Sequence, residues 1–191
     1  MIAVSAAVGC AASSPYQRAE TLKKGDTSWN IVVSGAYRFR NVGGSVPSIN
    51  WRRGIKDRVE LQAFVGGDGV GFGLKRALFN EGSVLMSVVT RGAFGIVSTS
   101  RPSLLVDSTL LLGLPVGKHQ WVFSQGLGYT PVVRTDTSSL SLHSSVGFSG
   151  AVGTVRFHPE ISIAFPIFDP RSIGLRAGIG FGFGRKAREK L

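Results

Sequence analysis

The sequence predicts an all-β protein, namely a closed, antiparallel, up-and-down transmembrane β-barrel of about ten strands. The observation that carries most weight is the alternation in residues 173–183, where apolar side chains occupy every second position. Only a strand has a period of two residues. The opposite face of that stretch is almost entirely glycine, which is unusual for the solvent side of a soluble sheet but suits the lumen side of a barrel strand whose other face meets lipid. That face carries Gly174, Arg176, Gly178, Gly180 and Gly182.

Composition and hydropathy are the two further observations that favour a barrel. The 191 residues include 26 Gly and 12 Phe, and only 17% are charged. No window reaches the roughly 18 to 20 uninterrupted apolar residues that a spanning helix requires. A closed barrel is the other way to cross a bilayer, because every backbone polar group must be paired inside it. Strands of alternating polarity average to only mild hydrophobicity, as observed in this chain.

The first ten residues form a signal-like or lipobox-like segment. Small residues precede Cys10 in Ala7–Cys10, as they do before a lipidated cysteine, and Ala11 follows it. The apolar stretch is short and contains no Lys or Arg, so an ordinary signal-peptide remnant with an incidental cysteine is the alternative. Cys10 is the single cysteine, which excludes an intrachain disulfide. We therefore treat Cys10 as a candidate for lipidation.

Residues 11–26 are polar and are interpreted as a linker, and residues 27–184 as the barrel. The first strand begins near Trp29, where Trp29, Ile31 and Val33 share one face and Asn30 and Val32 the other. Residues 185–191 are a basic tail, predicted to lie in the periplasm. The further strands are expected at about 47–53, 58–66, 69–79, 83–96, 104–115, 120–133, 140–155, 159–168 and 172–183.

The connections between these strands alternate in character. Those at 54–57, 80–82, 117–119 and 157–159 are tight and rich in turn formers, whereas several of the others, at 42–45, 98–102 and 135–138, are longer and polar. An even strand number puts both termini on one side, and short turns are typical of the periplasmic side. The sequence therefore predicts a bacterial outer-membrane location with both termini in the periplasm.

Alternation also places a set of charged side chains on the lumen face. Charges inside a narrow barrel are costly unless they are paired, so Glu60 and Glu160 are expected to pair with cations, and Arg176 to meet a carboxylate. Such a cluster either fills and rigidifies the interior or forms a constriction that passes small anions. The predicted cluster comprises Arg38, Glu60, Lys75, Arg91, Glu160 and Arg176.

The segment from Arg176 to Phe183 resembles the C-terminal signal of bacterial outer-membrane barrels. In that signal a polar residue is followed at fixed spacing by Gly and two aromatics, which here are Arg176, Gly178, Phe181 and Phe183. The resemblance implies a last strand that is handed to the barrel-assembly machinery and inserted into the outer membrane.

Three longer segments are similar to a little-characterised bacterial family of small outer-membrane barrels, whose members are often lipoproteins. These segments are Ala19–Gly25, Ser48–Leu61 and Gly71–Leu78, and the likeness spans nearly the whole barrel. The shared motifs are structural. They imply a barrel architecture and leave the activity open.

One pair of residues suggests an enzyme. His143 and Ser145 are two apart on a strand and share a face, so an imidazole could take the proton of Ser145. The spacing resembles the His-any-Ser pair of outer-membrane lipid A deacylases, although Val146 stands where that family has Asn. A membrane-lipid hydrolase that uses His143 and Ser145 is therefore one alternative function.

The leading functional prediction is a monomeric, non-enzymatic barrel with a structural, lipid-interacting or narrow-conduit role. Its expected partners are outer-membrane lipid, lipopolysaccharide and, during insertion, the barrel-assembly machinery. No cofactor or metal is expected. Nucleic-acid binding is not expected either, because the net charge of +11 is scattered over turns and strand ends without a recognition motif. A second alternative is a soluble, calycin-like barrel that binds a small apolar ligand. It requires an apolar interior formed by Trp29, Ile31, Phe123, Phe148, Ile179 and Phe181.

Overall fold

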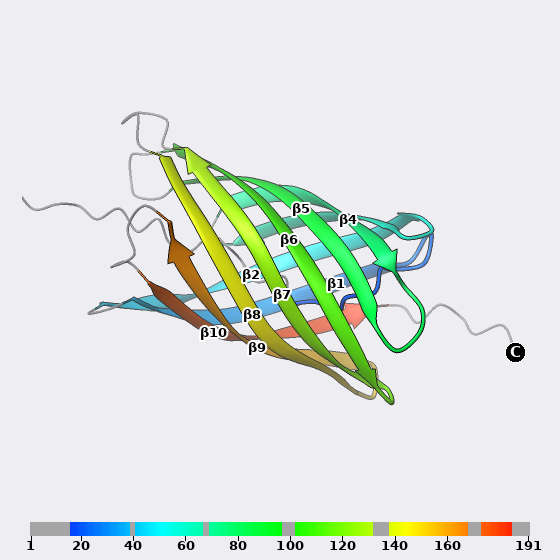
Figure 1. Ribbon diagram of the computed structural model, residues 1–191. Coiled ribbons are helices and arrows are strands. Elements are labelled where there is room, and N and C mark those ends of the chain that lie inside the picture. Colours follow the sequence, from blue (N-terminus) through cyan, green and yellow to red (C-terminus); the bar gives the residue numbers. More distant parts are fainter. Residues whose placement is uncertain are drawn as a thin grey trace, which may run out of the picture.

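The computed structural model describes residues 16–38, 41–66, 69–96, 102–131, 138–167 and 173–184. In this part of the chain ten strands form one closed barrel, and they run obliquely around it (Figure 1). The strands are β1 (Thr27–Arg38), β2 (Asn41–Lys56), β3 (Val59–Gly66), β4 (Gly69–Phe79), β5 (Leu85–Ile96), β6 (Pro102–Val116), β7 (His119–Pro131), β8 (Ser138–Val152), β9 (Val155–Pro166) and β10 (Gly174–Gly184).

Each strand pairs antiparallel with its neighbours in the sequence, and β10 closes the barrel on β1. That closing pair runs from Ser28 opposite Gly184 to Arg38 opposite Gly174. Closure leaves no strand with a row of unpaired backbone groups. The predicted fold class, a ten-stranded antiparallel barrel, is confirmed. The described residues contain no helix that is long and apolar enough to cross a membrane.

We call the end of the barrel where β1 begins and β10 ends the terminal end. The connections at this end are short, at 57–58, 80–84, 117–118 and 153–154. Gly117 and Gly153 each have φ of +59°, which only glycine adopts at little cost. These glycines make two-residue turns possible between long strands.

The strand bounds differ most from the prediction in two places. Residues 42–45, expected in a loop, belong to β2. The turn expected at 157–159 lies instead at 153–154, so that β9 begins at Val155 and the side chain of His158 is buried in the barrel. His158 and Pro159 continue β9. The chain reverses at Gly153, which has a left-handed φ.

The two faces of the strands differ in chemistry. In β4 and β7 exposed and buried residues alternate almost without a break. Most outward positions of the described strands are apolar; examples are Trp29 (52% exposed), Phe72 (66%) and Ile161 (60%). Inward positions carry most of the polar and charged side chains. A polar interior and an apolar exterior are the reverse of a soluble protein.

Four polar side chains interrupt the apolar exterior near the middle of a strand, one in each strand from β5 to β8; Arg53 of β2 and Arg76 of β4 are outward nearer the terminal end. Thr90 Oγ1 and Ser108 Oγ lie 3.3 Å apart, and Ser144 Oγ donates to Gln125 Oε1 at 2.6 Å. Each of these side chains therefore has a hydrogen-bond partner on the neighbouring strand, which lowers the cost of placing it on an apolar surface.

Candidate functional site

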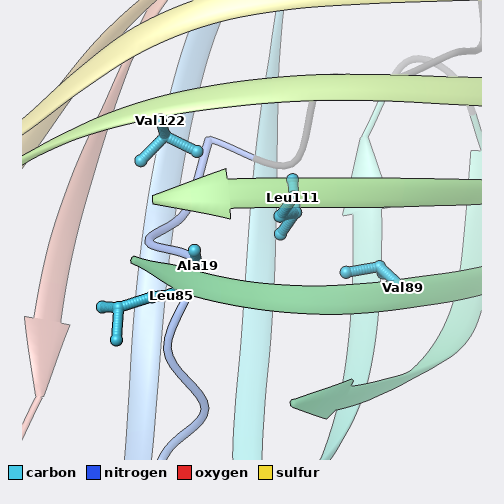
Figure 2. Packing of buried hydrophobic residues seen from close by; sticks show 5 residues of the cluster. All are labelled: Ala19, Leu85, Val89, Leu111 and Val122. Carbon is cyan, nitrogen blue, oxygen red and sulfur yellow. The ribbon is translucent and has the colours of Figure 1, made fainter. Parts of the chain in front are cut away.

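The interior of the barrel is filled by its own N-terminal segment. Residues 11–26 were interpreted as a linker, but Tyr16, Gln17, Ala19 and Thr21 are buried among the inward-facing side chains. Residues 11–15 lie outside the described part of the chain. We call residues 16–22 the N-terminal plug. Ala19 of the plug lies beside side chains of the strands (Figure 2). It forms a buried apolar cluster with Leu85, Val89, Leu111 and Val122.

Lys75 holds the plug by its backbone. Its side chain is fully buried, and Nζ donates to the carbonyl oxygens of Arg18 at 2.6 Å and Glu20 at 2.7 Å. Lys75 is opposite Glu60 in the β3–β4 register, which places a carboxylate beside this ammonium group. A buried cation that donates to two carbonyls and neighbours a carboxylate is compensated for the loss of water.

Glu60 holds the plug one step farther along. It is also fully buried, and its Oε2 accepts from the backbone amide of Leu22 at 3.1 Å. Oε1 accepts from Gln62 Nε2 at 2.9 Å and lies 3.5 Å from Arg52 Nη1. The predicted pairing of Glu60 with a cation therefore involves Arg52, a residue outside the predicted cluster.

Amide side chains complete the contacts around the plug. Gln120 accepts from the amide of Ala19 at 2.8 Å and donates to Glu20 Oε2 at 2.9 Å. Gln17 Oε1 accepts from Gln62 at 2.9 Å and from Arg52 at 3.2 Å, and Asn80 accepts from the amide of Thr21 at 3.1 Å. Buried backbone groups must find partners. Side chains of the barrel therefore accept from the backbone amides of Ala19 and Thr21, as backbone carbonyls do between strands of a sheet.

The glycine face of β10 makes room for the plug. A Cβ at Gly178 would lie 2.5 Å from Tyr16 Oη and 2.6 Å from Ser34 Cβ, and one at Gly180 would lie 3.1 Å from Tyr16 Cβ. The Tyr16 ring also meets the His158 ring edge-on, with centroids 6.5 Å apart. Arg176, on the same face, donates to Ser34 Oγ at 3.0 Å. The face thus accommodates an aromatic residue of the plug as well as the arginine.

We expect Gly178→Ala to destabilise the barrel by about 1–3 kcal/mol, because the added methyl group overpacks the contact with Tyr16 and Ser34. The measurement is urea unfolding of the protein in phospholipid vesicles. Gly35→Ala is the matched control, since a Cβ at Gly35 meets no atom within 4 Å. Equal stability of both variants would mean that β10 does not need its glycine at this position.

A second polar network lies on the inward faces of β5, β6 and β8. Asp107 Oδ1 accepts from Arg91 Nη2 at 3.1 Å and from Thr109 Oγ1 at 2.9 Å. His143 Nε2 lies 3.0 Å from Thr109 Oγ1 and 3.5 Å from Asp107 Oδ2. Gly126 is opposite His143 in the register, and any side chain there would overlap the imidazole. The network therefore depends on a glycine as well as on its polar members.

The two residues of the enzyme hypothesis make different bonds from those it requires. His143 contacts Thr109 and Asp107, whereas Ser145 Oγ lies 2.6 Å from Ser124 Oγ. Both side chains are inward, so a lipid outside the barrel would not reach them. In the described residues the geometry thus gives the serine no base to activate it.

The structure does not bring the predicted cluster together at one site: its described members have different partners, and Arg176 donates to Ser34. Glu60 and Lys75 hold the plug, and Arg91 belongs to the Asp107 network. Glu160 lies 3.2 Å from His158, which is its histidine partner on the same strand. The side chain of Arg38 and the lipidation candidate Cys10 lie outside the described residues. Of the assembly-signal residues, Phe181 and Phe183 face outward from β10.

Sequence reasoning missed Arg52, Asp107 and Gln120. Strict alternation would have found Asp107, because it lies between the outward residues Val106 and Ser108. Its inward neighbours on β6 include the apolar residues Leu105 and Leu111. In the described residues no group of three or more His, Cys, Asp or Glu could hold a metal ion.

The plug narrows the lumen. Beside Tyr16 and Gln17 the interior holds cavities of about 30 and 20 Å³, which is room for about one water each. At the terminal end the lumen widens to a cavity of about 500 Å³. Its lining includes Arg18, Glu20, Arg52 and Arg156. The lumen is therefore wide at the terminal end, and the plug fills it farther inside the barrel.

Comparisons with known proteins find similar chains only among solved structures. No family model matches, and neither does any curated protein. Among solved structures, the N-terminal β-barrel domain of Pseudomonas aeruginosa OprF is similar, with 13% identity and a TM-score of 0.39 over 83% of this chain and 97% of that one. The outer membrane protein OprG of the same organism has 12% identity and a TM-score of 0.36, covering 90% of this chain and 100% of OprG. Neisserial surface protein A has 10% identity and a TM-score of 0.36, covering 83% and 95%.

Identities of 10–13% and TM-scores below 0.4 are too low to transfer a function. The fold assignment rests on the strand pairing of this chain, which closes the barrel without reference to any other protein.

Proposed function

We propose that this protein is an integral, non-enzymatic barrel of the bacterial outer membrane, whose lumen is occupied by its own N-terminal plug. Its role is structural and lipid-interacting, and both termini lie in the periplasm. The observation that carries the proposal is the predominantly apolar exterior around a polar interior. A surface of that kind and size is unfavourable in water and suits contact with lipid.

The arrangement of the exterior supports a membrane-spanning position. Aromatic residues at the terminal end include Trp29, Trp121 and Phe183, and Phe94 and Tyr129 lie toward the other end. Aromatic side chains favour the two membrane interfaces. An 11-residue strand such as β4, tilted by about 40°, spans about 28 Å, close to the apolar band of about 25 Å in transmembrane barrels.

The alternative of a soluble barrel with an apolar ligand does not agree with the geometry. It requires an apolar interior, but Trp29, Ile31, Phe123 and Phe181 face outward and are 36–52% exposed. The interior instead holds Lys75, Glu60 and Asp107, which an apolar ligand would leave without compensation.

The plug favours a structural role over an open conduit. Its contacts with Lys75, Glu60 and Gln120 occupy the part of the lumen through which a solute would pass. A ten-stranded barrel is narrow even without such a segment. Conduction would therefore require the plug to move. Lipidation of Cys10 and cleavage of a signal segment remain predictions of the sequence.

The membrane location is tested by an arginine placed at two depths. Leu110 has three outward positions on each side of it along β6, so Leu110→Arg puts a charge near the bilayer midplane and is expected to cost about 2–4 kcal/mol of unfolding free energy. Val116→Arg, at the end of the same strand, is expected to cost about 0–1 kcal/mol. Urea unfolding in phospholipid vesicles measures both. If the two variants were equally stable and remained soluble without lipid or detergent, the membrane proposal would fail.

A further inference from the structure

A hollow lies on the outward face of β1 to β4. It has a volume of about 320 Å³, at the lower end of the range of ligand pockets. The hollow exists because Ala63, a small outward residue of β3, lies between Trp51 of β2 and Phe72 of β4 in the strand register. Every residue that lines it is apolar or glycine: Trp29, Ile49, Trp51, Ala63, Phe64, Val65, Val70, Gly71 and Phe72.

Two outward arginines lie on the same strands, toward the terminal end from the hollow. Arg53 of β2 is opposite Leu61 and Arg76 of β4 is opposite Val59, so the two arginines flank β3. Two strand spacings and an offset of two residues put their Cα atoms about 12 Å apart. Both side chains are exposed, and among the described residues neither side chain forms a hydrogen bond or an ion pair.

The surrounding rim strengthens this positive charge. The turn that joins β2 to β3 brings Lys56 and Arg58 to the same end, with Asp57 as its carboxylate. The turns at 117–118 and 153–154, on the other side of the barrel, contribute only Lys118 to the charged side chains of the rim. Among these three turns, the one next to the hollow therefore carries the most positively charged side chains.

We propose that this face binds one anionic phospholipid. An acyl chain lies in the hollow against Ala63, and the phosphate group lies between Arg53 and Arg76. An apolar slot continuous with a cationic edge fits a molecule that is apolar along its length and anionic at one end. Trp29 and Trp51, paired across β1 and β2, line the hollow on its side toward Arg53. Tryptophan favours this level of a membrane, near the headgroups. The inference rests on the membrane location proposed above and adds a defined site and lipid class.

The experiment uses tryptophan fluorescence in vesicles. In a Trp121→Phe background only Trp29 and Trp51 report, and both line the hollow. The probes are phosphatidylglycerol and phosphatidylcholine with brominated acyl chains, which quench tryptophan on contact. We expect brominated phosphatidylglycerol to quench at a lower mole fraction than brominated phosphatidylcholine. Each arginine near an anionic surface contributes about fivefold in affinity. The double variant Arg53→Gln, Arg76→Gln should therefore lower the preference for phosphatidylglycerol over phosphatidylcholine about 25-fold.

Controls separate the site from general electrostatics and from packing. Lys118→Gln removes a charge at the opposite rim and should leave the preference unchanged. Ala63→Leu fills the hollow and should weaken quenching by both lipids, whereas Ala177→Leu, another small outward residue on β10, should not. A protein that inserts but shows equal quenching by both lipids, or an unchanged preference in the double arginine variant, would overturn the lipid site alone. Failure to insert into either vesicle would overturn the membrane location itself.

Discussion

Replacing Lys75 by Met should destabilise the barrel by about 3–5 kcal/mol and release the N-terminal plug. The substitution removes the donor to the carbonyls of Arg18 and Glu20, and it leaves Glu60 buried with one cation fewer. Breaking a buried charge arrangement by removing one partner costs about this much, because the remaining groups stay desolvated. The effect is large because the lost contacts hold the segment that fills the lumen.

Three measurements on the Lys75→Met variant separate loss of stability from release of the plug. Urea unfolding in vesicles gives the stability, and trypsin cleavage after Arg18 in the folded barrel reports exposure of the plug. Planar bilayers report whether the lumen opens, with no conductance expected for the unaltered chain and discrete conductance steps for the variant. Lys118→Met, at an exposed turn, should match the unaltered protein in all three. Wild-type stability without cleavage at Arg18 would show that Lys75 is not what holds the plug.

Replacing Asp107 by Ala should also cost about 3–5 kcal/mol of unfolding free energy. Asp107 is 1% exposed and accepts from both Arg91 and Thr109, with His143 at 3.5 Å. Its removal leaves the buried guanidinium of Arg91 without this carboxylate and opens space beside Thr109. Asp57→Ala, in an exposed turn, is expected to change the stability by less than about 0.5 kcal/mol.

A double-mutant cycle tests the pairing within this network. Arg91→Met combined with Asp107→Leu replaces both charges by apolar side chains, and part of the lost stability should return. The coupling energy is expected to be about 0.5–3 kcal/mol. Additive effects of the two substitutions would mean that the 3.1 Å contact between Arg91 and Asp107 contributes nothing to folding.

The alternation of apolar residues predicted most of the fold. Along β7 the outward residues Trp121, Phe123 and Leu127 alternate with the inward residues Val122 and Ser124, as a period of two requires. The same rule placed Glu60, Lys75 and Arg91 on the inner face. It could do so because neighbouring side chains of a strand must point to opposite sides, whatever the rest of the chain does.

The predicted bounds were less accurate where turn chemistry was ambiguous. His158 and Pro159 were assigned to a turn, yet they belong to β9, and the chain reverses at 153–154. Gly153 has a left-handed φ, as Gly117 does, and the sequence does not reveal which of its many glycines adopt that conformation. Polar composition likewise suggested a linker at residues 11–26. A polar segment has no reason to avoid the interior of a barrel whose inner face is itself polar.

The sequence by itself determined the strand number, the two faces and the inward position of Glu60, Lys75 and Arg91, because these follow from local periodicity. Only the tertiary structure decided which of those residues meet. Lys75 and Gln120 converge on Arg18, Ala19 and Glu20 from strands that are far apart in the chain. Closure of the barrel fixes that convergence, since it sets which inward side chains share a depth. The plug fits there because Gly178 and Gly180 leave the space that Tyr16 fills.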